Sequence, residues 1–470
     1  MSKSIALYRR KTKALSPLLF FLLISFVVTV GPVQVVAASF EAVPSISVRY
    51  TAKQNIDSVD TDNIGSVDAT YLNYLLGVDL TYRTSRHEIG LEADGSYQQY
   101  LTIDGDVEDA ADSDPGDYDF FNYKGRLEYR YLYGRKFNFL IFDSFSQNRD
   151  LQEVFGAGTN SLNYRYLYTN NRFGVAGIFR PNPKLSLRIG YNYHSIIFPD
   201  PENDLLEDQK PPDSFEDRVL LRSEYDFNRK VTGIADVQYA QRTFEDVNDT
   251  DIADYRLIQG VVGLRYHINR HAYVEGTAGA AQRDVYDLSD ATLASPPYAA
   301  NTEAYELEDT TSPIVDIVFN YTKPKRYTWE VAGQQGISTY GNNLFYTHTT
   351  ARTNFKYFLT PKFAFDLEGR YQRAVFDADT NSRDWQWDED RTDDIMIGSA
   401  RMMWDIMQKN NRGTLTLIAG YDYQQRDSSI DDAEDYTAIY RNNFYTRSYD
   451  TQRDLWYVQI KVAPIIIAGK

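Results

Sequence analysis

Apolar and polar residues alternate over long stretches of the chain. In residues 362–376, KFAFDLEGRYQRAVF, the side chains of Phe363, Phe365, Leu367 and Tyr371 fall on one side of an extended chain, and the charged side chains fall on the other. A period of two is the pattern of a β-strand, and this run is longer than the usual strand of about 5–6 residues. The same alternation occurs in residues 123–133, 184–194, 327–334, 414–424 and 455–463. The pattern predicts an all-β protein with long strands.

The connections between these stretches fall into two classes. Eight short ones carry Lys or Arg and no acidic residue: 83–87, 134–136, 180–184, 228–230, 269–271, 323–326, 360–362 and 409–412. Long acidic stretches lie between them: 104–119, 199–217, 245–254, 284–310, 377–394 and 427–435. Gly, Pro, Asn and Asp in both classes indicate turns and loops. Eight tight turns join nine hairpins and predict about 18 strands. Sixteen is the alternative if the weakly patterned stretches 45–52 and 171–180 form no strand.

Long strands with one apolar and one charged face suit either a secreted β-sandwich or propeller, or a transmembrane barrel. The strands reach the roughly 9–11 residues that cross a bilayer at a tilt. Aromatic residues cluster at strand ends, and short turns alternate with long loops. These features favour a transmembrane antiparallel up-and-down β-barrel, with its apolar face against lipid and its charged face toward a wet interior. The short turns are then expected in the periplasm and the long acidic loops outside the cell.

The N-terminus has the organisation of a secretory signal peptide. Basic residues precede the apolar stretch 18–30, and small residues at 35–38 suit a cleavage site. We therefore expect residues 1–38 to be the signal and residues 39–470 to form a barrel in the outer membrane of a Gram-negative bacterium. An uncleaved anchor is the alternative, although the apolar run is short for a span of about 20 residues.

Composition limits the possible partners. The formal net charge of −17 argues against nucleic acid as a partner. The chain has no cysteine, so no disulfide contributes to its stability. It has 38 Tyr and 25 Phe, which suits a barrel with aromatic girdles at both membrane interfaces.

Residues 137–285 resemble the β-barrel porins that accompany exopolysaccharide loci in Gram-negative bacteria. The resemblance rests on FDSFSQNRD (142–150), NRFGVAGIFRPNPKLSLRIGYNYHS (171–195), SFEDRVLLRSEYDFNRKVTGIADVQYAQRTF (214–244) and GLRYHINRHAYVEG (263–276). These stretches share tandem Tyr residues and Pro-Lys or Asn-Arg turns between strands. The resemblance covers about a third of the chain and implies an outer-membrane location and a part in polysaccharide export or surface biology. It brings no catalytic motif. The chain departs from many outer-membrane barrels by ending in APIIIAGK rather than on an aromatic residue.

The histidines give little sign of catalysis or metal binding. His267 and His271 have a spacing of four, but they flank a predicted turn, where that spacing makes no shared helical face. His194 precedes Ser195, and no nucleophile motif accompanies the pair. His87 and His348 stand alone. The sequence therefore predicts no catalytic residue.

Two loop segments carry further candidate chemistry. Residues 112–119, DSDPGDYD, have Asp at alternate positions but lack the ordered spacing and the closing Glu of a calcium loop. Trp385 and Trp387 can stack on a sugar ring, but packing of the loop against the barrel rim is the preferred interpretation. The sequence thus predicts no metal site and no cofactor site.

The charged faces of two strands are the candidate pore lining: Lys124, Arg126, Glu128, Arg130, Asp366, Glu368 and Arg370. Their mixed signs predict a charge network that rigidifies the interior and filters solutes. We expect a passive or polysaccharide-export-associated pore that contacts outer-membrane lipid and lipopolysaccharide and passes small solutes or exopolysaccharide. One alternative is a structural or adhesion barrel whose acidic loops bind divalent ions or lipopolysaccharide. A barrel enzyme is a remote third possibility.

Overall fold

The computed structural model describes residues 39–54, 67–105, 119–134, 136–148, 168–198, 213–244, 254–286, 310–337, 346–376, 391–409, 412–429 and 451–468. Its strands are β1 (Ser39–Lys53), β2 (Val67–Arg83), β3 (His87–Gly105), β4 (Phe120–Tyr133), β5 (Phe137–Asn148), β6 (Tyr168–Asn182), β7 (Leu185–Ile197), β8 (Ser214–Asp226), β9 (Val231–Phe244), β10 (Asp254–Asn269), β11 (Ala272–Tyr286), β12 (Thr310–Lys323), β13 (Tyr327–Ile337), β14 (Thr347–Thr360), β15 (Phe363–Phe376), β16 (Arg391–Lys409), β17 (Arg412–Ser428), β18 (Thr451–Val462) and β19 (Ile466–Ala468). Among these residues, no helix is long and apolar enough to cross a membrane.

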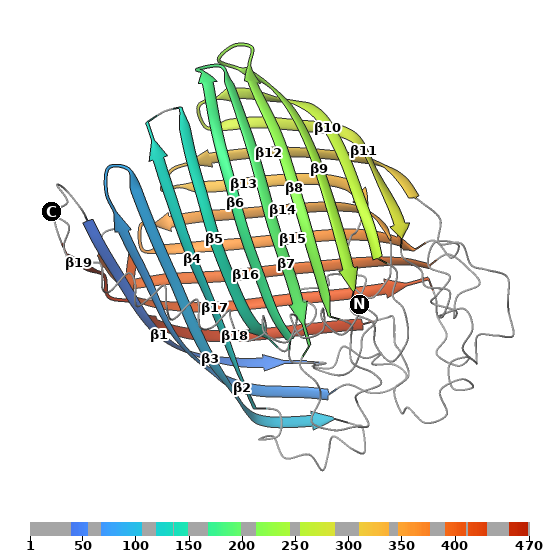
Figure 1. The fold of residues 1–470 in the computed structure, drawn as a ribbon. Helices are drawn as coiled ribbons and strands as arrows, with labels where there is room; N and C mark the ends of the chain where they lie inside the picture. The colour runs from blue at the N-terminus through green and yellow to red at the C-terminus, as the bar shows by residue number, and fades with distance from the viewer. Residues whose placement is uncertain are drawn as a thin grey trace, which may run out of the picture.

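The strands form one closed antiparallel ring (Figure 1). From β1 to β18 each strand pairs with the next one along the chain, and β1 closes the ring by pairing with β18 and β19. The last two share one place in the wall, since Val462 of β18 lies opposite Ile46 of β1 and Ile466 of β19 lies opposite Ala42. The barrel therefore has 18 wall positions. The predicted strand count is confirmed, and the two weakly patterned stretches form β1 and β6.

Short polar side chains close the tight turns. Asn182 Oδ1 accepts hydrogen bonds from the backbone N–H groups of Lys184 and Leu185, both at 2.9 Å. A side-chain oxygen closes other turns in the same way, at Thr84, Asn228, Asn269 and Thr360. Asn and Thr favour turns because their side chains can bond to the backbone a few residues further on. The short connections at these five positions therefore fold as the predicted tight turns.

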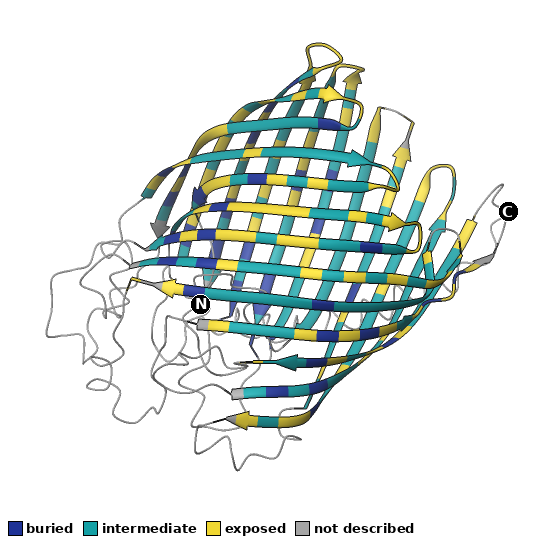
Figure 2. Cartoon of the chain, turned by 180° about the vertical axis from the view of Figure 1, so that it is seen from behind, coloured by how far each residue is buried: buried dark blue, intermediate teal, exposed yellow. Residues whose placement is uncertain are grey.

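The register gives the barrel one apolar and one polar face. Val48 lies opposite Tyr74 of β2 and Ile460 of β18, and these three side chains are exposed by 39% to 54%. The residues between them point to the other face, where Gln459 Nε2 donates to Ser47 Oγ at 2.9 Å. Exposed and less exposed positions alternate along strands around the ring (Figure 2). An apolar surface this extensive exceeds the patches found on soluble proteins and corresponds to the lipid-facing band of a membrane barrel.

Tyrosine and aspartate pair repeatedly on the outer face, near the barrel end from which the long connections leave. The phenol O–H donates to the carboxylate from Tyr97 to Asp119 (2.6 Å), Tyr191 to Asp217 (2.5 Å), Tyr371 to Asp394 (2.6 Å) and Tyr421 to Asp454. Each Tyr lies on an odd-numbered strand and each Asp on the neighbouring even-numbered one or just before it. Because amphipathic aromatic rings favour the boundary between lipid and water, these pairs mark one edge of the apolar band.

Candidate functional site: the inner wall

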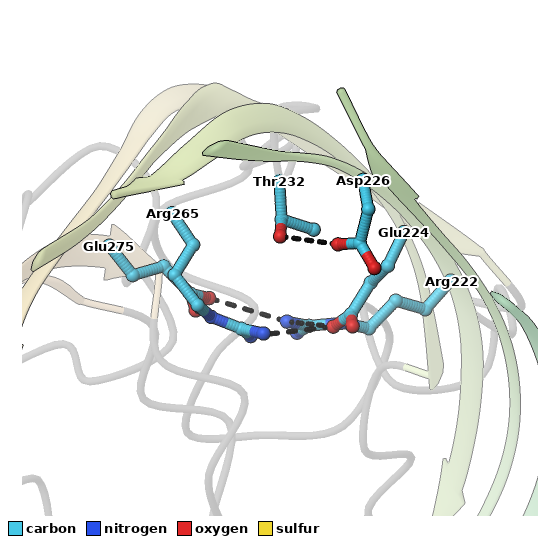
Figure 3. Close-up of polar contacts among 6 residues, drawn as sticks. All are labelled: Arg222, Glu224, Asp226, Thr232, Arg265 and Glu275. Carbon is cyan, nitrogen blue, oxygen red and sulfur yellow. Dashed lines mark hydrogen bonds and ion pairs between the residues drawn. The ribbon is translucent and has the colours of Figure 1, made fainter. Parts of the chain in front are cut away.

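Charged side chains gather on the concave face of the barrel. Figure 3 shows Arg222, Glu224, Arg265 and Glu275 projecting from the wall into the interior. Leu221, adjacent to Arg222 in the chain, is 47% exposed on the opposite, outer face. Antiparallel partners lie on the same face of a sheet. The register therefore shows, strand by strand around the ring, which residues face inward and which face outward.

The structure places all seven sequence-predicted residues on this inner face. On β4, Arg126 lies opposite Glu92 of β3 and Ser144 of β5, and its three predicted companions share its parity. On β15, Leu367 is 47% exposed outside, so the alternating Asp366, Glu368 and Arg370 point inward. Ten strands separate β4 from β15 in one direction around the ring and six in the other. The seven residues thus form two separate groups.

The β4 group takes part in a ladder of ion pairs. Lys124 Nζ lies 3.3 Å from Asp94 Oδ2, and Arg126 Nη2 lies 2.8 Å from Glu128 Oε2. Arg130 also pairs with Glu128, and its Nη1 lies 3.8 Å from Glu88 Oε1. The side chains are partly exposed, so each pair stabilises the fold by only about 0–1 kcal/mol. What the ladder provides is a fixed arrangement of charges of both signs on this wall.

The β15 group is less connected. Arg370 Nη2 donates to Gln372 Oε1. Asp366 lies between Lys356 of β14 and Arg401 of β16 in the register, but it forms no ion pair among the described residues. Arg401 Nη2 instead approaches Asp422 Oδ1 at 3.7 Å. The signs alternate across these strands, so this wall also carries charge of both kinds.

Four residues that the sequence did not single out form a closed charge ring (Figure 3). Arg222 Nη2 lies 2.9 Å from Glu224 Oε1 and 3.3 Å from Glu275 Oε1. Arg265 Nε lies 2.7 Å from Glu275 Oε2, and its Nη2 lies 3.4 Å from Glu224 Oε1. The ring ties β8 to β10 and β11 across the intervening β9. Each guanidinium contacts both carboxylates, so the ring leaves neither sign in excess. We call these four residues the charge ring.

A polar hollow of about 340 Å³ lies in another part of the inner wall, between β3 and β6. Two register rows cross it. One runs Glu92, Arg126, Ser144 and Arg172, and the other runs Asp94, Lys124, Ser146 and Asn170. The hollow exists because β5 supplies only serine at both rows, where the flanking strands supply long side chains. We call this feature the β3–β6 hollow.

Three of the described histidines have structural hydrogen bonds. His194 Nε2 lies 2.9 Å from Asn170 Oδ1, and His87 Nδ1 lies 2.9 Å from the Tyr129 hydroxyl. His271 Nδ1 lies 3.0 Å from the backbone oxygen of Thr322. Within the described residues, no group of three or more His, Cys, Asp or Glu side chains is arranged to hold a metal ion. Residues 112–118, Trp385 and Trp387 lie outside the described residues.

No protein-family model matches the chain, and no curated protein matches it. Among solved structures, the chain is similar to OprD of Pseudomonas aeruginosa, with 10% identity, a TM-score of 0.40, and coverage of 90% of this chain and 95% of that one. It is similar to OccK9 (OpdG) of Pseudomonas aeruginosa, with 11% identity, a TM-score of 0.44, and coverage of 91% and 98%. It is also similar to OccAB4 of Acinetobacter baumannii, with 11% identity, a TM-score of 0.43, and coverage of 93% and 100%. Similarity at this level does not transfer a function to this chain.

Proposed function

We propose that this protein is an outer-membrane β-barrel that forms a passive pore for small solutes. One observation carries the proposal: a closed ring of strands is apolar on its outer face and charged on its inner face. A water-soluble β-protein has the inverse arrangement, with its apolar faces packed inside. A charged and hydrated interior suits a conduit for polar solutes.

The proposed location follows from the same arrangement. Outer-membrane barrels have short periplasmic turns and long external loops. Accordingly, the basic turns face the periplasm and the Tyr–Asp pairs lie at the outer leaflet, in contact with lipopolysaccharide. Residues 1–38, which lie outside the described residues, serve as a cleaved export signal. The signal pattern and the barrel support this placement independently.

A pore is favoured over an enzyme by the environment of the histidines. His194 contacts the Asn170 amide, His87 a phenol and His271 a backbone oxygen. None of these partners is the carboxylate that orients a catalytic histidine in hydrolases. The carboxylates of the charge ring, Glu224 and Glu275, are instead bound to arginines.

A role in exopolysaccharide export is the finer form of the proposal. It rests on the resemblance of residues 137–285 to porins of exopolysaccharide loci. Deleting the gene from its native host and measuring secreted polysaccharide tests this role. Unchanged secretion together with lost uptake of small solutes leaves the passive pore alone.

Conductance tests the pore itself. Purified refolded protein inserted into a planar lipid bilayer is expected to give discrete, ohmic current steps. A barrel that migrates as folded protein and inserts into liposomes without conducting contradicts the proposal. That result favours a structural or adhesion barrel whose acidic external loops bind divalent ions or lipopolysaccharide.

A further inference from the structure

We propose that the β3–β6 hollow is a binding subsite for a short zwitterionic peptide. The proposal rests on the proposed pore, because the hollow opens on the inner wall and receives its ligand from solutes that enter the barrel. It assigns a solute class to the pore.

The first argument is the distribution of unsatisfied charge. Lys124 is paired with Asp94, and Arg126 is paired with Glu128. Glu92 and Arg172, at opposite ends of one register row, form no ion pair among the described residues, and both side chains are exposed. Among the described residues, the hollow therefore has one anionic end and one cationic end without an ion-pair partner.

The second argument is the chemistry of each end. A guanidinium presents a planar fork of N–H donors that matches a carboxylate in two parallel hydrogen bonds. A carboxylate such as Glu92 accepts hydrogen bonds from an ammonium group. A ligand with an ammonium at one end and a carboxylate at the other satisfies both residues, whereas an ion of one sign satisfies only one.

The third argument is the floor between the two ends. Ser144 and Ser146 of β5 and Asn170 of β6 line it. Their hydroxyl and amide groups can donate and accept hydrogen bonds. These groups suit the alternating N–H and C=O groups of a peptide backbone, each of which needs a partner.

The fourth argument is size. Three strand spacings separate the backbone at Glu92 from that at Arg172, or roughly 14 Å at about 4.8 Å each. Three extended residues span about 10 Å, and the Glu92 and Arg172 side chains are long enough to reach across the remaining difference. The volume of about 340 Å³ also lies at the small end of ligand pockets. These dimensions select a tripeptide rather than a single amino acid or a long polymer.

The test uses three probes: triglycine, N-acetyl-triglycine and triglycine amide. The first carries both charges, the second only the carboxylate and the third only the ammonium. Binding to the purified barrel in detergent is measured by ligand-observed NMR, which requires no conduction. Triglycine is expected to bind at least fivefold more tightly than either blocked form.

Three variants test which residue binds the carboxylate of the peptide and which binds its ammonium group. Arg172→Gln is expected to weaken the binding of triglycine at least fivefold and to leave the binding of triglycine amide unchanged. Glu92→Gln is expected to weaken the binding of triglycine by a similar factor and to leave the binding of N-acetyl-triglycine unchanged. Arg172→Lys keeps the cation and is expected to retain part of the affinity. The matched control is Arg188→Gln, which removes an exposed inward arginine of β7 outside the hollow and is expected to leave all three affinities unchanged.

The possible outcomes distinguish failure of the proposed subsite from failure of the proposed pore function. Equal binding of the three probes, or equal effects of Arg172→Gln and Arg188→Gln, overturns the subsite even if the barrel conducts. Triglycine binding that Arg172→Gln abolishes, in a barrel without conductance, supports the subsite and overturns the pore. Transient blocks of the bilayer current by triglycine that shorten in Arg172→Gln support both.

Discussion

The charge ring and the β3–β6 hollow are built from the same residue types and behave differently. In the ring, two arginines and two glutamates from three strands satisfy one another at 2.7–3.4 Å. In the hollow, Glu92 and Arg172 lie three strands apart, with Arg126 and Ser144 between them in the register row. The comparison shows that pairing, rather than composition, decides whether an inner-wall charge supports the wall or remains available to a solute.

The backbones of β10 and β11 approach each other closely beside the charge ring. Gly263, two residues before Arg265 on the inner face of β10, lies so close to β11 that an added Cβ would stand 2.1 Å from the backbone oxygen of Gly276. Glycine in a strand allows such close approach. Arg265 and Glu275 are direct partners in the register of β10 and β11, so their side chains lie opposite each other on the inner face. In the hollow, small side chains on β5 widen the space instead.

Removing one carboxylate from the charge ring and one from the hollow should give the largest difference in the free energy of unfolding between the two regions. Glu275→Gln leaves Arg222 and Arg265 short of a partner and is expected to lower the free energy of unfolding by about 1–3 kcal/mol. Glu92→Gln, which breaks no ion pair, is expected to change it by less than about 0.5 kcal/mol. Urea unfolding in liposomes, followed by tryptophan fluorescence, measures both variants. Similar losses would mean that the ring is no more coupled than the hollow.

Double-mutant cycles compare the two regions by a smaller quantity, the coupling free energy between two charged residues. Arg265→Gln combined with Glu275→Gln is expected to show a coupling of about 1 kcal/mol, because the two groups contact each other directly. Glu92→Gln combined with Arg172→Gln is expected to be additive to within about 0.5 kcal/mol in the absence of ligand. Coupling in the second cycle would indicate that the two charges already interact in the empty hollow.

The smallest expected effect concerns ion preference. Arg126→Ala is expected to change conductance more than selectivity, since one wall charge among many is removed and the lumen widens. Deleting residues 104–117 is expected to reduce a weak cation preference, because the acidic loops concentrate cations at the mouth. That preference should fade as the Debye length falls from about 30 Å at 0.01 M salt to about 3 Å at 1 M. Reversal potentials in a salt gradient measure it, and an anion-selective pore contradicts it.

The fold was accessible from sequence because alternation, turn residues and loop length are local signals. The 18 strand positions follow from a period of two together with the spacing of the turns, and the inward direction of the seven predicted residues follows from the period alone. β5 alternates poorly in sequence for a reason that only the structure gives. Phe142 points inward, where the Arg126 guanidinium lies 4.8 Å from its ring centroid. Asp143 points outward, where it accepts a hydrogen bond from Asn171 Nδ2 at 3.4 Å.

The charge ring and the hollow were not accessible from sequence. The ring joins Arg222 of β8 to Glu275 of β11, so it depends on how sharply the wall curves across three neighbouring strands. The hollow depends on lateral register, which places Ser144 between Arg126 and Arg172. Both are relations between strands, and neither leaves a pattern within one strand. Inward position could be predicted, but the partner of each charge could not.

Cysteine accessibility tests the central claim most directly, namely that the inner face lines water and the outer face contacts lipid. The chain has no cysteine, so Thr416→Cys and Leu417→Cys each introduce a unique thiol on β17. Thr416 points inward, where its Oγ1 lies 2.7 Å from Asp405 Oδ1, and Leu417 lies outside, opposite Ile460. In liposomes, a membrane-impermeant methanethiosulfonate is expected to modify the first thiol rapidly and to reduce the single-channel current, while the second stays unmodified. Equal modification of both, or modification of the second alone, would contradict the assignment of the two faces.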